Sequence, residues 1–172
     1  MQKKLTQADM VMLTEQYLNE NFELRFNVLS KKIEVRERKV QNACFEPLTE
    51  KKRNSIVRRI KMELEEVKNV KQNVQEYVDS EDIRQYDPIR DWLQGLPKWD
   101  GQNRLVELFG RIPGISSEQI YWCSIWTRSA VAHWLGMDTL HGNECVPTFI
   151  GSQGCGKSTF CQRLLPKHLR VY

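Results

Sequence analysis

The chain has 172 residues, of which 40% are hydrophobic and 28% are charged, and its formal net charge at pH 7 is +4. This mixture is typical of a globular protein and not of a disordered chain. No apolar run approaches the roughly 20 residues that a membrane-spanning helix needs. The cysteines are odd in number and form no C-x-x-C pair, so we expect a reducing compartment and a cytoplasmic protein. The small basic excess permits nucleic-acid binding without requiring it.

Two elements are expected before residue 40. Thr6, with Asp9 three residues later, is typical of a helix N-terminus and predicts a helix from residue 6 to about residue 19. Residues 23–29 and 33–38 each alternate with a period of two, as half-buried strands do. Ser30-Lys31-Lys32 can turn the chain between them. We therefore predict a β-hairpin over residues 24–38, with its charged side facing solvent.

Two further helices are expected at residues 49–68 and 70–78. Ile56, Ile60 and Leu64 form part of the apolar stripe of the first of them. Its basic residues fall mostly on the opposite side and are Lys51, Lys52, Arg58, Arg59 and Lys61. The favoured interpretation of this surface is a solvated charged face, and the alternative is a contact with the DNA backbone.

The composition changes after residue 82, and tryptophan becomes frequent. Asp87 and Pro88 are typical of a cap and the first residue of a helix. A turn-rich stretch around Trp99 precedes a helix that starts at residue 104. Residues 117–136 predict a long helix whose stripe would place Trp126 and Trp134 in a core. We expect two domains, residues 1–82 with the hairpin and residues 83–172 with the tryptophan-rich segment.

Residues 151–158 match the phosphate-binding pattern G-x-x-x-x-G-K-S. Before them, Val146, Phe149 and Ile150 form a short apolar run suited to a buried strand. After them, Phe160 and Leu164 recur at helical spacing. The expected order is therefore strand, glycine-rich loop and helix, which is the order that this motif requires.

The residue types of the loop explain the chemistry that we expect of it. Glycines allow a tight turn in which successive N–H groups point at phosphate oxygens, next to the positive end of a helix. Lys157 can reach the β- and γ-phosphates of ATP, and the Ser158 hydroxyl can bind Mg²⁺. The residues expected at the nucleotide are Gly151, Ser152, Gln153, Gly154, Cys155, Gly156, Lys157, Ser158 and Thr159.

Several motifs together resemble the virulence-associated protein E family of phages, plasmids and integrated islands. They are the stretch from Tyr86 to Leu93, the stretch Leu96-Pro97-Lys98-Trp99-Asp100-Gly101 followed by Arg104-Leu105, and the loop. The resemblance covers about residues 21–166, and Asp87 stands where the family usually has a histidine before proline. It implies a P-loop ATPase similar to superfamily-three helicases and primase-helicases, which form homo-oligomeric rings around DNA during replication.

The resemblance also indicates what the chain lacks. P-loop ATPases need a second, acidic strand for Mg²⁺ and water, together with an arginine supplied in trans. The 14 residues after Ser158 contain no Asp or Glu. We therefore expect an ATP-binding fragment, inactive by itself, of a helicase-like replication ATPase. Its fold class would be α+β leading into α/β, ending in the first strand, loop and helix of a truncated P-loop domain.

Two other functions stay open at this point. The chain could be a non-enzymatic module that binds DNA or other subunits and carries a vestigial loop. It could also be another P-loop enzyme, such as a small-molecule kinase, although kinases normally place this loop near the N-terminus. Neither alternative implies contact with a membrane.

Overall fold

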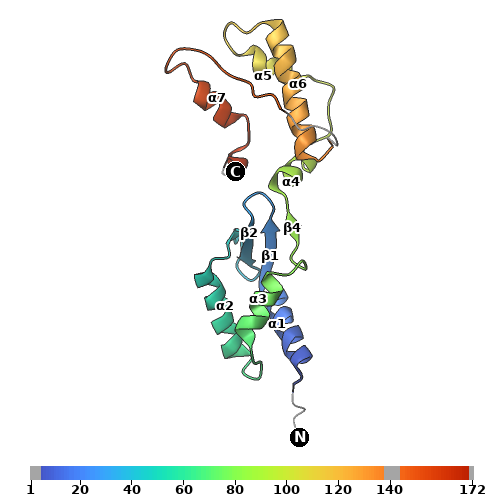
Figure 1. The fold of residues 1–172 in the computed structure, drawn as a ribbon, viewed down its shortest axis with the longest axis vertical. Coiled ribbons are helices and arrows are strands. Elements are labelled where there is room, and N and C mark those ends of the chain that lie inside the picture. Colours follow the sequence, from blue (N-terminus) through green and yellow to red (C-terminus); the bar gives the residue numbers. More distant parts are fainter. Residues whose placement is uncertain (1–4, 138–143, 171–172) are drawn as a thin grey trace. The chain divides into compact units, whose positions relative to one another are not determined.

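The computed structural model describes residues 5–137 and 144–170, and the chain separates into two compact units, Met1–Asp87 and Pro88–Tyr172 (Figure 1). The coarse fold class is α+β, with one mixed sheet of four strands among the helices. The division falls after strand β4 (Gln85–Tyr86), which pairs with the sheet of the first unit. Within the described ranges, no helix is both long and apolar enough to cross a membrane.

The first unit begins with helix α1 (Gln7–Asn21), whose N-terminus is fixed by two reciprocal hydrogen bonds. The Asp9 N–H donates to the Thr6 hydroxyl at 3.2 Å, and the Thr6 N–H donates to Asp9 Oδ2 at 2.8 Å. This capping box satisfies backbone donors that a helix leaves without partners at its start. The predicted helix is confirmed, and it continues to Asn21 instead of ending near residue 19.

The predicted hairpin is also confirmed. Strand β1 (Phe22–Asn27) pairs antiparallel with β2 (Lys32–Glu37), with Asn27 opposite Lys32. The buried Asn27 holds the turn, because its side-chain oxygen accepts hydrogen bonds from the N–H groups of Leu29 and Ser30 at 3.0 and 3.1 Å. An asparagine-based turn of this kind takes the place of the glycine turn that many hairpins use.

Two short strands complete the sheet in the order β3-β2-β1-β4. Strand β3 (Glu46–Pro47) is antiparallel to β2, and β4 is parallel to β1. The Arg25 guanidinium of β1 lies 3.6 Å from the ring centroid of Phe45 and 3.4 Å from that of Tyr86. It also forms an ion pair with Glu34 at 2.7 Å, and these two side chains are only 21% and 13% exposed. The charged side of the hairpin is therefore partly covered, in contrast to the solvated face that the alternation predicted.

Helices α2 (Glu50–Glu63) and α3 (Val70–Val78) follow β3. The Thr49 hydroxyl caps α2 by accepting the Lys52 N–H at 3.2 Å. The prediction that this helix runs to residue 68 is wrong, because Leu64 leaves helical geometry at φ −121° and ψ 69°. The bounds predicted for α3 are confirmed.

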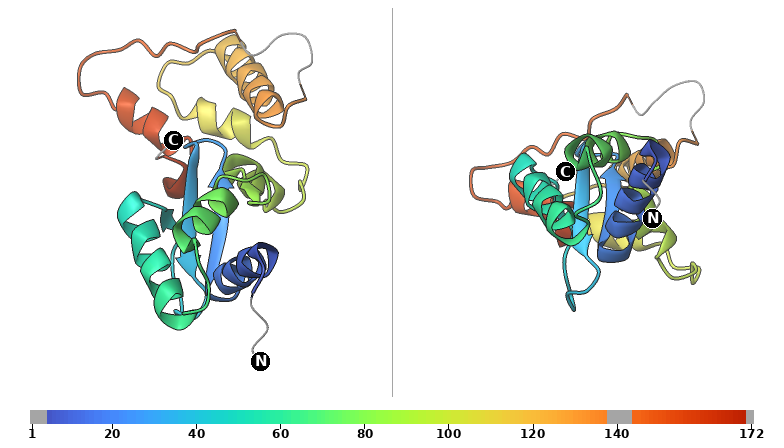
Figure 2. Two further views of the ribbon diagram at one scale, coloured as in Figure 1. Left: turned by 60° about the horizontal axis from the view of Figure 1, so that its bottom comes forward. Right: turned by 90° about the horizontal axis from the view of Figure 1, so that it is seen from below.

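The core of the first unit lies between helices α1, α2 and α3 and one face of the hairpin. Figure 2 shows α3 between α1 and α2, next to the strands. Successive residues of a strand point to opposite faces, so Phe22 and Val35 face the core while Arg25 and Glu34 do not. The buried apolar residues of this core are Tyr17, Leu18, Phe22, Val35, Ile56, Val57, Ile60, Val67, Val70, Val74 and Val78.

The described part of the second unit consists of helices and connecting segments. They are α4 (Pro88–Gln94), α5 (Arg104–Gly110), α6 (Ser117–Trp134), α7 (Lys157–Arg163) and a 3₁₀ turn at Lys167–Leu169. Helix α6 packs on α5, and its start is fixed by a capping box between Ser116 and Gln119. Of the stripe expected to form a core on α6, only Ala130 is buried, while Trp126 and Trp134 are half-buried. The predicted tryptophan-rich core is wrong, because α5 covers too little of α6 to bury its large side chains.

The strand expected before the glycine-rich loop is absent from the described part of that stretch, residues 144–150. Val146 and Ile150 are 84% and 94% exposed. A strand needs a neighbour to accept its backbone hydrogen bonds, and no strand of the described second unit is available to pair with it. The segment is held instead by the Trp126 indole, which donates to the Cys145 carbonyl oxygen at 2.9 Å.

Candidate functional site

The glycine-rich loop is closed on itself by one lysine side chain. Lys157 Nζ donates to the carbonyl oxygens of Gly151 and Ser152, at 2.7 and 2.8 Å, and to Cys155 Sγ at 3.5 Å. Lys157 is also the first residue of α7. One ammonium group therefore joins the start of the loop to the start of the helix that follows it.

Three glycines permit this path of the backbone. Gly154 and Gly156 have φ angles of +83° and +89°, a region that is costly for residues with a side chain. Gly151 differs, because a Cβ atom at this position would lie 3.0 Å from Cys155 Sγ, so the Cys155 side chain would have to move slightly. The first glycine of the pattern G-x-x-x-x-G, Gly151, therefore lies close to the Cys155 side chain, and the last, Gly156, has left-handed backbone geometry.

The loop presents its hydrogen-bond donors to solvent. Residues 151–156 are exposed, as are Ser158 and Thr159 in the first turn of α7. Residues 153–154 form a turn, and the other N–H groups of the loop are exposed to solvent. A loop with exposed N–H donors, a lysine and a hydroxyl matches the donor set that phosphate oxygens and their Mg²⁺ ion require. These residues therefore fit the nucleotide and the metal predicted for them.

Phe160 attaches the loop to the rest of the second unit. Its ring packs edge-on against Phe149, with centroids 5.4 Å apart, and lies 6.3 Å from the ring of Phe109. Phe109 belongs to α5 and is buried. The residues before and after the loop thus meet through aromatic contacts, and residues 144–150 form no strand.

The Trp99-Asp100-Gly101 turn, to which the sequence assigned no role, is held by its own hydrogen bonds. The Asp100 carboxylate forms a two-pronged ion pair with Arg104, at 2.8 and 2.5 Å, and accepts the Gln102 N–H at 3.1 Å. The Arg104 guanidinium and the Gln102 N–H hold the pKa of Asp100 well below its usual range. The spacing of Asp100 and Arg104, four residues apart, was the signal that could have revealed this pair.

The five basic residues for which a DNA contact was the alternative interpretation do not form a single surface. Lys51, Arg58 and Lys61 are exposed, and their spacing of seven and three residues places them on one side of α2. Lys52 and Arg59 have carboxylate partners instead.

Lys52 Nζ lies 2.7 Å from Glu46 Oε1, and this hydrogen bond raises the pKa of Lys52. Arg59 Nη1 lies 3.2 Å from Glu37 Oε1, and the guanidinium lies 5.1 Å from the centroid of the Phe22 ring. These two side chains connect α2 to the sheet, so they are part of the fold of the first unit. Within the described residues, no group of His, Cys, Asp and Glu side chains is arranged to hold a metal ion.

No protein-family model matches the chain, and comparison with curated proteins and with solved structures finds no match. The resemblance to the virulence-associated protein E family therefore rests on the sequence motifs alone.

Proposed function

We propose that residues 151–159 bind the phosphates of ATP together with Mg²⁺. We propose further that the chain acts in the replication of a mobile genetic element as part of a helicase-like ATPase. The observation that supports nucleotide binding is the closed, exposed loop, in which Lys157 reaches the Gly151 and Ser152 carbonyl oxygens. The helicase-like role is supported by the sequence resemblance.

The loop residues would divide the work between them. Phosphate oxygens would accept hydrogen bonds from the N–H groups of residues 152–156, and Lys157 would exchange its carbonyl partners for a phosphate. The exposed Ser158 hydroxyl is placed in the first helical turn, where it would contribute a ligand to Mg²⁺. When bound, the Mg²⁺ ion neutralises part of the negative charge of the phosphates.

A titration with a fluorescent ATP analogue in the presence of Mg²⁺ tests nucleotide binding. Lys157→Ala removes a charge-assisted hydrogen bond worth about 1.5–3 kcal/mol, so affinity should fall by about 10- to 150-fold. Lys167→Ala is the matched control, because it removes the same charge from another exposed lysine of the second unit. Equal affinity of the parent and Lys157→Ala proteins would contradict the assignment.

A second candidate function is a non-enzymatic module that binds DNA or further copies of the chain. Two observations favour it: the unformed strand at residues 144–150, and the exposed face of Lys51, Arg58 and Lys61. In this case the chain should bind duplex DNA with an affinity that depends on salt but not on ATP or Lys157. Sedimentation of the parent protein with and without Mg-ATP would show whether a homo-oligomer forms, and whether its formation depends on nucleotide.

A further inference from the structure

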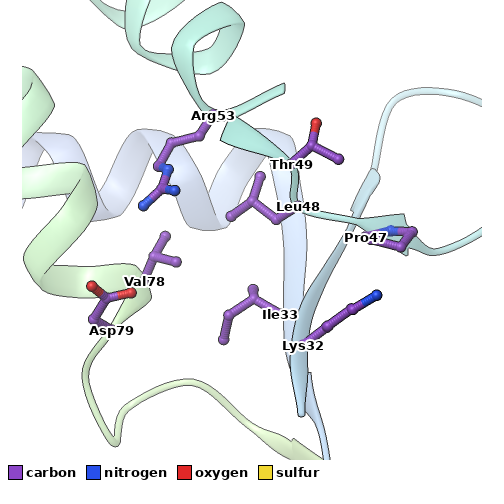
Figure 3. Close-up of a pocket in the computed structure, with 8 residues that line it drawn as sticks. All are labelled: Lys32, Ile33, Pro47, Leu48, Thr49, Arg53, Val78 and Asp79. Carbon is purple, nitrogen blue, oxygen red and sulfur yellow. The ribbon is translucent and has the colours of Figure 1, made fainter. Parts of the chain in front are cut away.

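A pocket of about 330 Å³ opens on the first unit, where β2, the link from β3 to α2, α2 itself and the end of α3 meet (Figure 3). Its volume is at the lower end of the range of roughly 300–1,000 Å³ that is typical of small-molecule sites. Its size suits a small ligand. All of its lining residues belong to the first unit, so it is independent of the glycine-rich loop.

The middle of the pocket is apolar. Figure 3 shows the side chains of Ile33, Leu48 and Val78 pointing toward one another across it. Val78 is buried, and Ile33 and Leu48 are half-buried at the edge of the hydrophobic core. This surface suits a branched aliphatic group, because covering it removes further apolar area from water.

One end of the pocket carries a cation and an anion that are bridged by a third side chain. Arg53 Nη1 donates to Gln75 Oε1, and Gln75 Nε2 donates to Asp79 Oδ2. Figure 3 shows the Arg53 guanidinium and the Asp79 carboxylate at the same end, next to Val78. The structure contains no ion pair of Arg53 with a carboxylate of the described residues.

Both charged groups keep unused hydrogen-bonding capacity. A guanidinium has five N–H donors, and a carboxylate can accept about four hydrogen bonds. The bridge through Gln75 uses one position on each of them. A ligand can therefore bind to Arg53 and Asp79 without breaking the bridge.

We propose that this pocket binds a free α-amino acid with a branched aliphatic side chain, such as leucine. The α-carboxylate of the ligand accepts hydrogen bonds from Arg53, and its α-ammonium group donates to Asp79. The side chain lies against Ile33, Leu48 and Val78. A zwitterion complements this pair of charges because it brings one oppositely charged partner for the half-buried Arg53 and one for the exposed Asp79.

Two-dimensional NMR of the full chain tests the proposal with leucine and three analogues. Leucinamide lacks the carboxylate, N-acetylleucine lacks the ammonium group, and N-acetylleucinamide lacks both. Leucine should shift the signals of Ile33, Leu48 and Val78 in a saturable way, and each singly altered analogue should bind about tenfold more weakly or worse. Arg53→Gln and Asp79→Asn should each weaken leucine binding to a similar extent. Lys51→Gln is the control, because it changes an exposed charge of α2 outside the pocket.

Three results would overturn the proposal. The first is the absence of a saturable shift up to the solubility limit of leucine. The second is binding of N-acetylleucinamide as strong as that of leucine, which would point to an internal peptide segment as the ligand. The third is unchanged leucine affinity in a correctly folded Asp79→Asn protein. The comparison of ligands on the parent chain decides the question even if a variant fails to fold.

Discussion

The ammonium group of Lys157 lies 2.7 Å from the carbonyl oxygen of Gly151, six residues earlier in the chain. This contact closes the glycine-rich loop in the absence of any β-strand at residues 144–150. The shape of the loop is therefore determined by its own residues, by two left-handed glycines and by the lysine, and not by a supporting sheet.

The close approach of Gly151 and Cys155 leads to a double-mutant test. Gly151→Ala should weaken binding of the fluorescent ATP analogue, because the added Cβ atom would lie 3.0 Å from Cys155 Sγ and push the loop open. Cys155→Ala alone should have little effect, and combined with Gly151→Ala it should restore affinity because the clash is gone.

Gly156→Ala is the matched control for this test. Its φ angle of +89° costs a residue with a side chain about 1–2 kcal/mol, whatever surrounds it. Cys155→Ala should therefore not restore its affinity. Equal recovery of both glycine variants would show that the contact between Gly151 and Cys155 does not control the loop.

The turn at Trp99 should resist acid further than a free carboxylate would allow. The pKa of Asp100 is lowered in the folded turn by Arg104 and the Gln102 N–H. Its stabilising effect is therefore complete above the pKa of a free aspartate, about 3.9, and is lost as pH falls through the lowered value. The Trp99 indole N–H, which donates to the Gln102 carbonyl oxygen at 3.1 Å, provides an NMR signal for this transition.

Two variants complete this measurement. Asp100→Asn should move the Trp99 indole signal toward its unstructured position at every pH. Glu118→Gln is the control, because Glu118 is an exposed carboxylate of α6 that is not among the groups that shift the pKa of Asp100 or Arg104. A Trp99 signal that titrates near pH 3.9 in the parent protein would contradict the lowered pKa.

The basic residues of α2 should separate into two groups by experiment. If Lys51, Arg58 and Lys61 each contact one phosphate, reversing all three to Glu should lower the salt slope of DNA binding by about 2.7, at about 0.9 per contact. The stability of the first unit should change little, because these side chains are exposed. The control is a triple variant in which three other exposed lysines, Lys71, Lys98 and Lys167, are changed to Glu. It changes the net charge by the same amount.

Arg59→Glu should instead lower the stability of the first unit and leave the salt slope of DNA binding nearly unchanged. It would place a second carboxylate next to Glu37, so the midpoint of urea denaturation should fall. If the salt slope is unchanged when Lys51, Arg58 and Lys61 are all changed to Glu, these residues do not contact DNA. They then form the solvated surface that the sequence favoured.

Hydrogen exchange should be slowest in the first unit and not in the tryptophan-rich helices. Ile60 and Val74 are at most 1% exposed, whereas Trp122 is 58% exposed. Ile60→Ala should lower the free energy of unfolding of the first unit by about 2–5 kcal/mol and speed exchange throughout its strands and helices. Slower exchange in α6 than in β1 would show that the second unit has the more stable core.

The sequence by itself determined the features that depend on neighbouring residues. The capping box of Thr6 and Asp9, the bounds of α3 and the hairpin could be predicted because each rests on hydrogen bonds or periodicities within a few residues. The motif also indicated that glycines would turn the loop tightly, and Gly154 and Gly156 have positive φ angles.

Only the tertiary structure decided which predicted surfaces are covered. The apolar run from Val146 to Ile150 forms no strand, because a strand depends on a partner that the local sequence does not specify. Lys52 and Arg59 have the same sequence signature as Lys51 and Arg58, but their carboxylate partners come from the sheet, up to 22 residues away. Contacts between distant segments are not encoded in local periodicity, so these assignments required the folded chain.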